Sequence, residues 1–391
     1  MQAQFSQRMA GVSGSAIREI FKLLANPEVI SFAGGNPAPA SFPVADIEQI
    51  TQRVLEQQGA SVLQYGSTEG YPPLVQALPD WLARFGVCAT AETMLVVSGA
   101  QQGIDLISKA MLDPGDVVLA ESPTFLGALQ IFATYQADVR PLASDEEGVL
   151  PEDLEEKIKT LRPKFVYLIP TFQNPTGKTL GLARRQRIVE IAARYNTLIL
   201  EDDPYRDLRY AGQELPSMKS LDRDGNVVYL SSFSKVISPG LRCGVAVAQA
   251  DILRKMVIGM QATSVHANNL GQAIVHGYLT SGKMPEHLAQ IRALYKIQLD
   301  TMLGAIEAHF PREVFYTRPE GGLFVWAELP EGMDAGEILK KSSARNVAFV
   351  PGTSFFPQGG HTNTMRLNFS ASTPERIERG IEILADVIKN A

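Results

Sequence analysis

Residues 165–203, FVYLIPTFQNPTGKTLGLARRQRIVEIAARYNTLILEDD, contain two short apolar runs on either side of an amphipathic segment. The runs FVYLI and TLIL do not alternate with polar residues, which is typical of strands that are buried on both faces. In LARRQRIVEIAARY, between them, apolar residues recur at the spacing of one helix face. A strand, a helix and a strand in this order predict a parallel βαβ unit.

The same succession of strand-like and helical segments extends in both directions along the chain. Further strand-like runs are MLVVSG (94–99), VVLAES (117–122), VVYLSS (227–232) and GVAVA (244–248). They predict an α/β fold in which helices cover both faces of a mainly parallel sheet. We assign this large domain to residues 46–285.

The pattern changes beyond Lys283. A long helical stretch precedes VFYTRPEGGLFVWAEL (314–329), which predicts two strands joined at a Glu-Gly-Gly turn. A smaller α+β domain is therefore expected from residues 286–391 together with residues 1–45. The helical pattern SAIREIFKLLA, residues 15–25, is expected to pack near it.

Composition limits the classes of partner. The 391 residues are 45% hydrophobic and 20% charged, as in an ordinary globular protein, and the formal net charge of -6 argues against a nucleic-acid surface. The two cysteines, Cys88 and Cys243, lie far apart in the sequence without CxxC spacing, so we expect neither a metal site nor a disulfide framework. The chain shows no secretory signal and no apolar run near the roughly 20 residues that span a bilayer. We expect a cytoplasmic protein without a membrane partner.

Two glycine-containing motifs could bind phosphate. VVSGAQQG places Gly99 between a strand and a helix, where the N–H groups of Ala100 and Gln101 and the positive helix end can face an anion. Taken alone, this segment is either such a site or a structural turn. NPTGKTLG (174–181) is superficially similar to a Walker A loop, but Phe172 stands where the upstream glycine is required, which excludes a P-loop.

The segment SFSKVISPGLR, residues 232–242, presents a lysine among small polar residues. Ser232 and Ser234 precede Lys235, and Arg242 follows after a Pro-Gly turn. A neighbouring cation and partial burial would both favour the neutral amine, which is the nucleophilic form of lysine. The alternative is an exposed lysine in a loop.

Short motifs in a fixed order identify a family resemblance. The chain resembles the class I aminotransferases of fold type I, which depend on pyridoxal phosphate, and is most similar to the subgroup that contains 2-aminoadipate and kynurenine aminotransferases. The resemblance covers essentially the whole chain and implies a seven-stranded sheet in the large domain. The motifs are SFAGGNP (31–37), LQYGSTEG (63–70), VVSGAQQG (96–103), ESPTF (121–125), PTFQNPTG (170–177), LILEDDPY (198–205), SFSK (232–235) with its following arginine, and MRLNFS (365–370).

The resemblance implies roles for the residues that would hold the cofactor ring. Lys235 would bind the cofactor as an imine and then move protons, and Asp202 would keep the ring nitrogen protonated so that the ring can accept electrons. Tyr205 and Asn174 would donate to the ring 3-oxygen, and Phe125 would stack on the ring where relatives often have tyrosine. Taken alone, Asp202 also suits a turn cap beside Pro204, and Asn174 suits a turn.

The resemblance also implies how the cofactor phosphate is bound. The cradle would consist of the backbone at Gly99, Ala100 and Gln101, with Ser232, Ser234 and Arg242. Ala100 stands where many relatives have a hydroxyl. Tyr65 matches a tyrosine that reaches the phosphate of the neighbouring subunit in this family, which implies a homodimer with shared active sites. Its alternative is a half-buried loop tyrosine.

Substrate residues follow from the same resemblance. Arg366 would bind the α-carboxylate of the substrate, assisted by Asn174, unless it is an exposed strand arginine. Ser15 and Arg18 match a pattern whose arginine meets the distal carboxylate of glutamate or 2-aminoadipate, although a helix arginine can also simply be solvated. Gly34 and Gly35 would let the backbone approach the substrate closely.

The resemblance implies an aminotransferase that moves an amino group between an L-amino acid and a 2-oxo acid. The amino acid would be 2-aminoadipate, glutamate, an aromatic or a branched-chain residue, and the usual oxo acid 2-oxoglutarate. Two alternatives remain at this point: a carbon–sulfur β-lyase with the same cofactor, and a regulator domain of similar fold without turnover.

Overall fold

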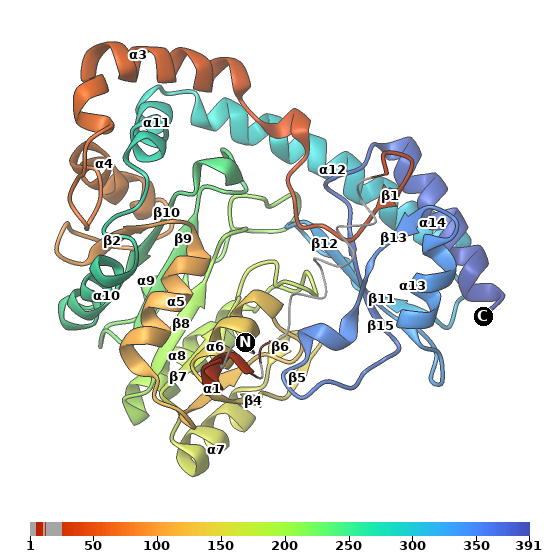
Figure 1. The fold of residues 1–391 in the computed structure, drawn as a ribbon. Coiled ribbons are helices and arrows are strands. Elements are labelled where there is room, and N and C mark those ends of the chain that lie inside the picture. Colours follow the sequence, from red (N-terminus) through yellow and green to blue (C-terminus); the bar gives the residue numbers. More distant parts are fainter. Residues whose placement is uncertain (1–4, 11, 13–25) are drawn as a thin grey trace.

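The structure is a computed structural model that describes residues 5–10, 12 and 26–391. The helix expected at residues 15–25 lies outside the described residues, as do Ser15 and Arg18. Figure 1 shows a larger sheet flanked by helices and, on the side where the chain ends, a smaller sheet with its own helices.

In the described part of the chain the larger sheet has seven strands, and β10 runs opposite to the other six. This confirms the prediction of a mainly parallel sheet. In sheet order the strands are β2 (Met94–Val97), β10 (Gly244–Val247), β9 (Val227–Ser232), β8 (Leu198–Asp202), β7 (Phe165–Leu168), β3 (Val117–Ala120) and β4 (Asp138–Pro141).

Helices on both faces of this sheet explain why its strands are apolar without alternation. Leu119, Val166 and Ile199 pack into one core with α7, α8 and α9, and on the other face Ala120 and Tyr167 pack into a second core with α5 and α6. Burial of both strand faces removes the need for a polar side. These helices are α5 (Ala100–Met111), α6 (Leu126–Thr134), α7 (Pro151–Leu161), α8 (Leu182–Tyr195) and α9 (Met218–Leu221).

The parallel strands bring their polar ends to one edge of the sheet. Asp202 and Ser232 are the last residues of β8 and β9, and Gly99 follows β2 and caps the start of α5. Parallel neighbours end on the same side, so side chains far apart in the sequence become neighbours there, at the edge where ligands collect in such sheets.

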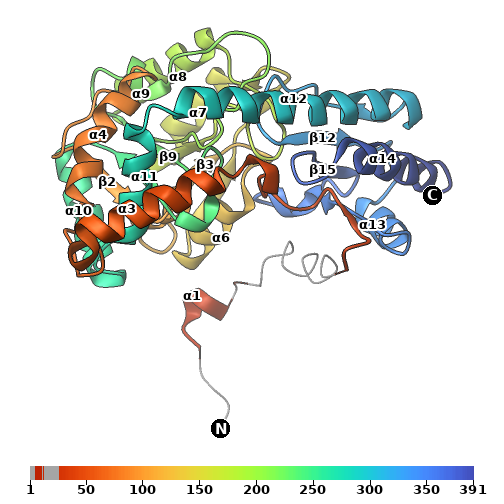
Figure 2. The ribbon, with the colours of Figure 1, turned by 90° about the horizontal axis from the view of Figure 1, so that it is seen from above.

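The smaller sheet is antiparallel, in the order β11–β12–β15–β14. Its first two strands are joined by the predicted Glu-Gly-Gly turn. Helix α12 (Met284–His309) runs from beside the larger sheet to the smaller one, where it packs on α14 (Pro374–Lys389) (Figure 2). The strands are β11 (Phe315–Tyr316), β12 (Phe324–Glu328), β14 (Val350–Pro351) and β15 (Thr364–Asn368).

The N-terminal segment is fixed to the C-terminal part of the chain. Strand β1 (Ile30–Ser31) pairs in parallel with β13 (Val347–Ala348), and the Asn368 N–H donates to the Phe32 carbonyl over 2.8 Å. This pairing joins residues 30–32 to the C-terminal part of the chain. The boundaries of the two domains stay a prediction.

No helix in the described part of the chain has both the length and the apolar character required to cross a membrane.

The remaining elements lie around and between the two sheets. The elements are α1 (Gln7–Ala10), α3 (Val44–Val62), α4 (Pro72–Ala83), α10 (Ala250–Thr263), α11 (Asn269–Thr280), α13 (Ala335–Ser343), the short pair β5 (Ser144–Asp145) and β6 (Gly148–Val149), and three 3-10 turns at Pro39–Ser41, Pro239–Leu241 and Gly352–Phe355.

Candidate active site

A cavity of about 370 Å³ lies where the C-terminal edge of the larger sheet meets β12 and β15. It collects most of the site residues that the sequence predicts. A cavity of about 430 Å³ between α3 and α12 contains none of them. The predicted residues that line the first cavity are Gly35, Gly99, Ala100, Gln101, Phe125, Asn174, Asp202, Tyr205, Ser232, Ser234, Lys235, Arg242 and Arg366.

Lys235 lines this cavity and is not the exposed loop lysine of the alternative interpretation. Its Nζ donates to the Gly35 carbonyl over 2.6 Å. Burial, followed by the charges of Arg366 and Arg242, lowers the pKa of Lys235 to about 8. A larger share of this amine is therefore neutral near pH 7 than in an exposed lysine, and the neutral amine is the nucleophile.

Asp202 presents one free carboxylate oxygen. Its Oδ2 accepts a hydrogen bond of 2.7 Å from the Tyr167 hydroxyl, whereas Oδ1 is buried without a hydrogen-bond partner among the described residues. Burial raises the pKa of Asp202 to about 7, the Tyr167 hydrogen bond opposes this rise, and Asp203 adds to it. A buried acceptor without a partner is rare, and it suits a donor supplied by a ligand.

Arg366 is buried and has no acidic partner among the described residues. The side chain is 2% exposed and lies between the rings of Phe324 and Phe355, at 4.3 and 4.9 Å from their centroids. Nη2 donates to the Ala33 carbonyl over 2.7 Å, while Nε is buried without a partner in the described part of the chain. Burial lowers the pKa of Arg366 to about 10. A buried guanidinium with a free N–H is suited to an anion.

Asn174 and Tyr205 lie beside Arg366. Arg366 Nη1 donates to Asn174 Oδ1 over 2.9 Å, which leaves the amide N–H groups of Asn174 as donors toward the cavity. The buried Tyr205 ring meets Phe324 edge-on at a centroid distance of 5.9 Å. Burial raises the pKa of Tyr205 above its ordinary value, so its hydroxyl remains a donor.

An anion cradle forms at the opposite end of the cavity. The first N–H groups of α5, at Ala100 and Gln101, lack an intrahelical acceptor, as at any helix start. Arg242 Nη2 donates to the Ser98 carbonyl over 2.6 Å. Gly99 has a φ of +82°, and a Cβ added there would lie 2.9 Å from Arg242 Nη2, so glycine serves both the turn and the close approach.

The two serines of SFSK extend this cradle. Ser232 Oγ donates to Ser234 Oγ over 2.8 Å, and the Ser234 N–H donates back to Ser232 Oγ over 3.1 Å. Each hydroxyl oxygen keeps acceptor capacity, and the Ser234 hydroxyl keeps its proton as a donor toward the cavity.

The other predicted residues fall into two groups. Phe125 precedes α6, and a Cβ on Gly127 would lie 2.5 Å from its ring, so that glycine makes room for the aromatic face. Gly34 is buried beside the cavity without lining it. Tyr65 is 80% exposed and lies outside the cavity of its own chain, which corrects the alternative of a half-buried loop tyrosine.

Sequence reasoning missed several lining residues. Asn36, Pro204 and Pro239 are neighbours of predicted residues, and Ile169 follows β7 on the face that also carries Tyr167. Phe324 opens β12 opposite Asn368, and nothing in its local sequence distinguishes it. Phe165, Tyr167 and Ile169 stand at every second position, which places them on one strand face. This spacing was the signal in the sequence for Ile169.

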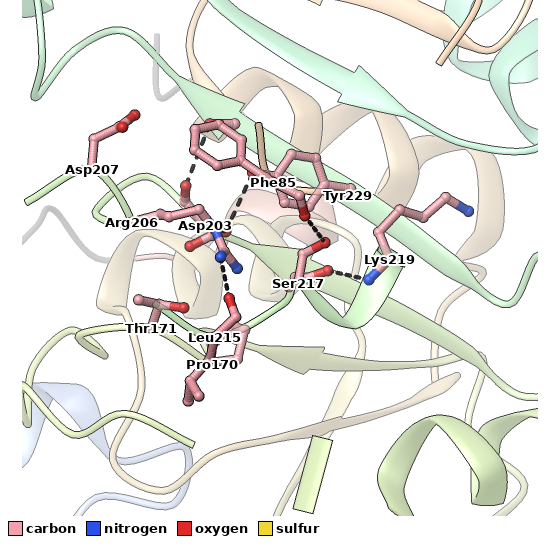
Figure 3. A network of polar contacts seen from close by, with 12 residues as sticks. Phe85, Pro170, Thr171, Asp203, Arg206, Asp207, Leu215, Ser217, Lys219 and Tyr229 are labelled. Carbon is pink, nitrogen blue, oxygen red and sulfur yellow. Dashed lines mark hydrogen bonds and ion pairs between the residues drawn. The ribbon is translucent and has the colours of Figure 1, made fainter. Parts of the chain in front are cut away.

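A separate polar network surrounds Asp203, the residue that follows Asp202 in the chain (Figure 3). Arg206 is hydrogen-bonded to Asp203 through Nε and donates from Nη1 to the Leu215 carbonyl over 2.5 Å. The Tyr229 hydroxyl donates to Asp203 Oδ2 over 3.3 Å. None of these four residues lines the cavity, so the network lies outside the candidate site.

Comparisons with known proteins cover almost the whole chain. Residues 27–384 match the family model described as aminotransferase class I and II. The aromatic-amino-acid aminotransferase 1 of Thermococcus litoralis is 43% identical, over 98% of this chain and 94% of its own length.

Two solved structures superpose on almost the whole chain. The alpha-aminoadipate aminotransferase of Thermus thermophilus, complexed with N-(5'-phosphopyridoxyl)-L-leucine, has a TM-score of 0.93 and 39% identity, covering 99% of this chain and 97% of that chain. The kynurenine aminotransferase of Pyrococcus horikoshii, in complex with PMP and its substrates and products, has a TM-score of 0.95 and 40% identity, with the same two coverages.

Proposed function

The chain belongs to the class I and II aminotransferases and is a pyridoxal-phosphate-dependent enzyme, and we propose that the cavity around Lys235 is its active site. The observation that carries this assignment is the pairing, in one cavity, of the lysine of lowered pKa with the free buried oxygen of Asp202. Membership of this family, and relatives that are aminotransferases, favour transamination over the β-lyase and regulator alternatives.

The residues present fit the cofactor at each of its groups. Asp202 Oδ1 would accept from the protonated ring nitrogen, and Tyr205 with the Asn174 amide would donate to the ring 3-oxygen. Phe125 would lie on the ring face. When bound, the cofactor supplies an electron sink for the bond that breaks at the substrate Cα. Lys235 would hold it through Nζ and would accept the Cα proton on the same atom.

The anion cradle would bind the cofactor phosphate. The α5 N-terminus contributes two backbone N–H groups and the positive end of the helix dipole. Arg242 adds a planar cation and Ser232 with Ser234 adds hydroxyls. Many relatives have a hydroxyl at the position of Ala100 that could donate to the phosphate. Its absence here leaves the other donors in place.

Arg366 would bind the substrate α-carboxylate through its free Nε–H, and with it align the Cα–H bond. The relatives support the choice of substrates, since their names include aminoadipate, kynurenine and aromatic amino acids. We propose 2-aminoadipate, glutamate, aromatic and branched-chain amino acids as donors and 2-oxoglutarate as the common acceptor. Arg18 would meet an acidic side chain, with Ser15 beside it and Gly34 and Gly35 close to the substrate.

We propose a homodimer in which Tyr65 reaches the phosphate in the partner subunit. The loop at Tyr65 is fixed by the Asn269 amide, which donates to the Gln64 carbonyl over 2.9 Å, and by the Gly66 N–H, which donates to His266 Nε2 over 3.2 Å. Its neighbour Leu63 is 70% exposed. An exposed aromatic held by an ordered loop beside an exposed leucine suits a subunit contact.

We also propose the domain division at residues 46–285, with residues 1–45 and 286–391 as the smaller domain, and a cytoplasmic location. The two sheets, each with its own helices, support the division.

The test of this function is the half-reaction. Glutamate, added without an acceptor, should convert the bound aldehyde cofactor to its amine form and release one equivalent of 2-oxoglutarate, followed by absorbance. Pyruvate and ammonia from cysteine-type substrates, without such conversion, would instead indicate a lyase. In the same assay, Arg18→Ala should slow the half-reaction with glutamate and with 2-aminoadipate but not with phenylalanine. An equal effect on all three amino acids would reject the role of Arg18.

A further inference from the structure

The carboxylate of Asp202 is oriented by one hydrogen bond. The Tyr167 hydroxyl donates to Oδ2 over 2.7 Å, and no other hydrogen bond reaches either oxygen within the described residues. Rotation of the carboxylate about its last bond would exchange the two oxygens. Tyr167 therefore determines which direction the free acceptor, Oδ1, faces.

Tyr167 itself has little freedom to move. It lies on β7, which pairs in parallel with β8, and its register partner is Leu200, two residues before Asp202 on the same strand face. The Tyr167 ring is fully buried and meets the Phe132 ring edge-on at 5.6 Å between centroids. Phe132 is packed in turn against Phe165. A hydroxyl on a ring packed in this way has a defined position.

We propose that Tyr167 is a positioning residue that aims Asp202 Oδ1 at the ring nitrogen of the cofactor. This inference rests on the proposed role of Asp202. Tyr167 does not touch the cavity itself, so it acts through the carboxylate and is not a catalytic residue.

Electrostatics around Asp202 give this hydrogen bond a second effect. Two further acidic groups lie near the carboxylate: Asp203 follows it in the chain, and Glu121, just after β3, accepts from the Ile169 N–H over 2.8 Å. Burial raises the pKa of Glu121 to about 8, and the charge of Asp202 contributes to that rise. Tyr167 is the side-chain donor that favours the charged form of Asp202 in the absence of ligand.

The structure supplies a matched control in Tyr229. It is also fully buried, lies on β9, the other neighbour of β8, and donates to a carboxylate, but to Asp203 rather than Asp202 (Figure 3). Tyr167→Phe and Tyr229→Phe each remove one hydroxyl oxygen from a buried ring beside an aspartate. Only the first change removes a hydrogen bond from Asp202, the residue proposed to meet the ring nitrogen.

The experiment measures binding of two ligands to the cofactor-free protein. Pyridoxamine phosphate is an amine, so it cannot bond covalently to Lys235, and its dissociation constant reports the non-covalent site alone. Its analogue with the ring nitrogen replaced by C–H lacks the group that Asp202 would meet. Thermal unfolding of each cofactor-free variant checks that it is folded.

For Tyr167→Phe we expect about tenfold weaker binding of pyridoxamine phosphate, and less than about twofold change for the analogue, because a hydrogen bond to a charged group is being lost. Tyr229→Phe should leave both constants within about twofold of the wild type. This pattern places the effect of Tyr167 on the ring nitrogen.

Two results would overturn the inference alone. If Tyr167→Phe binds pyridoxamine phosphate as the wild type does, the hydroxyl has no positioning role. If Tyr167→Phe weakens the binding of both ligands equally, or is unfolded where Tyr229→Phe remains folded, Tyr167 maintains the shape of the cavity and does not orient Asp202 toward the ring nitrogen. A wild type that binds the two ligands equally would instead refute the assignment of Asp202, and with it the inference, while the half-reaction would still test transamination.

Discussion

Arg366 Nη1 donates a hydrogen bond of 2.9 Å to Oδ1 of Asn174, 192 residues away in the sequence. The bond joins β15 of the smaller sheet to the turn that follows β7 of the larger one. It links a residue proposed to bind the substrate carboxylate to one proposed to bind the cofactor oxygen. Substrate and cofactor would thus be positioned by a single rigid pair.

Arg366→Lys should reduce kcat/KM for glutamate roughly 100-fold, about 2.7 kcal/mol, because lysine keeps the charge but lacks the planar fork whose separate nitrogens meet Asn174, Ala33 and a carboxylate. Steady-state kinetics measure the change. Arg318→Lys, at an exposed arginine of the same part of the chain, is the control and should remain at the wild-type value. Equal kinetics in both variants would contradict the carboxylate role.

Lys235→Ala should still bind pyridoxamine phosphate but lose more than about 10³-fold in transamination, because the proton-transfer group is removed. Borohydride reduction followed by mass spectrometry should find the cofactor attached to Lys235 in the wild type and to no residue in the variant. Lys255→Ala, an exposed lysine on α10, is expected to behave as the wild type. Attachment at another lysine in the wild type would reject the assignment.

The pH dependence of covalent attachment should report the lowered pKa of Lys235. Its pKa of about 8 means that the neutral, nucleophilic amine grows about tenfold per pH unit below that value and then saturates. We expect the attachment rate of pyridoxal phosphate to rise up to about pH 8 and level off above it. A blocked lysine derivative in solution, followed in parallel, corrects for titration of the cofactor and should continue to rise toward pH 10. The same continued rise in the protein would contradict the prediction.

Gly99→Ala should weaken binding of pyridoxal phosphate about tenfold beyond any effect of backbone strain, because the new Cβ would lie 2.9 Å from Arg242 Nη2. Gly115→Ala provides the matched control, since Gly115 also has a positive φ, +89°, but open space around it. Pyridoxal, which lacks the phosphate, should bind both variants similarly. A loss of pyridoxal binding as large as that of pyridoxal phosphate would argue against a phosphate cradle at Gly99.

Shared active sites can be tested by mixing two weakened variants. Tyr65→Ala and Lys235→Ala should each lose activity alone. In a mixed dimer, the subunit with an intact Lys235 receives Tyr65 from its partner, so random reassociation should restore about a quarter of the wild-type activity. Activity that remains the simple average of the two parents would place Tyr65 outside the partner's site.

Much of this molecule could be predicted from local sequence. Runs such as FVYLI and TLIL predict buried strands because a strand covered on both faces has no polar side, and the structure has them as β7 and β8. The order of the motifs identified the family. The same motifs singled out Lys235, Asp202 and Arg366, since each lies in a short segment with a distinctive sequence.

Tertiary structure decided the rest, because it depends on which strands become neighbours. Only the pairing of β7 with β8 brings Tyr167 to Asp202 and leaves Oδ1 free, and only the packing of the two sheets places Arg366 on Asn174. Hydrogen bonds between residues far apart leave no periodic trace in the sequence. The sequence by itself therefore determined the fold class and named the chemical groups proposed for the site, whereas the tertiary structure decided which atom of each group has no partner among the described residues.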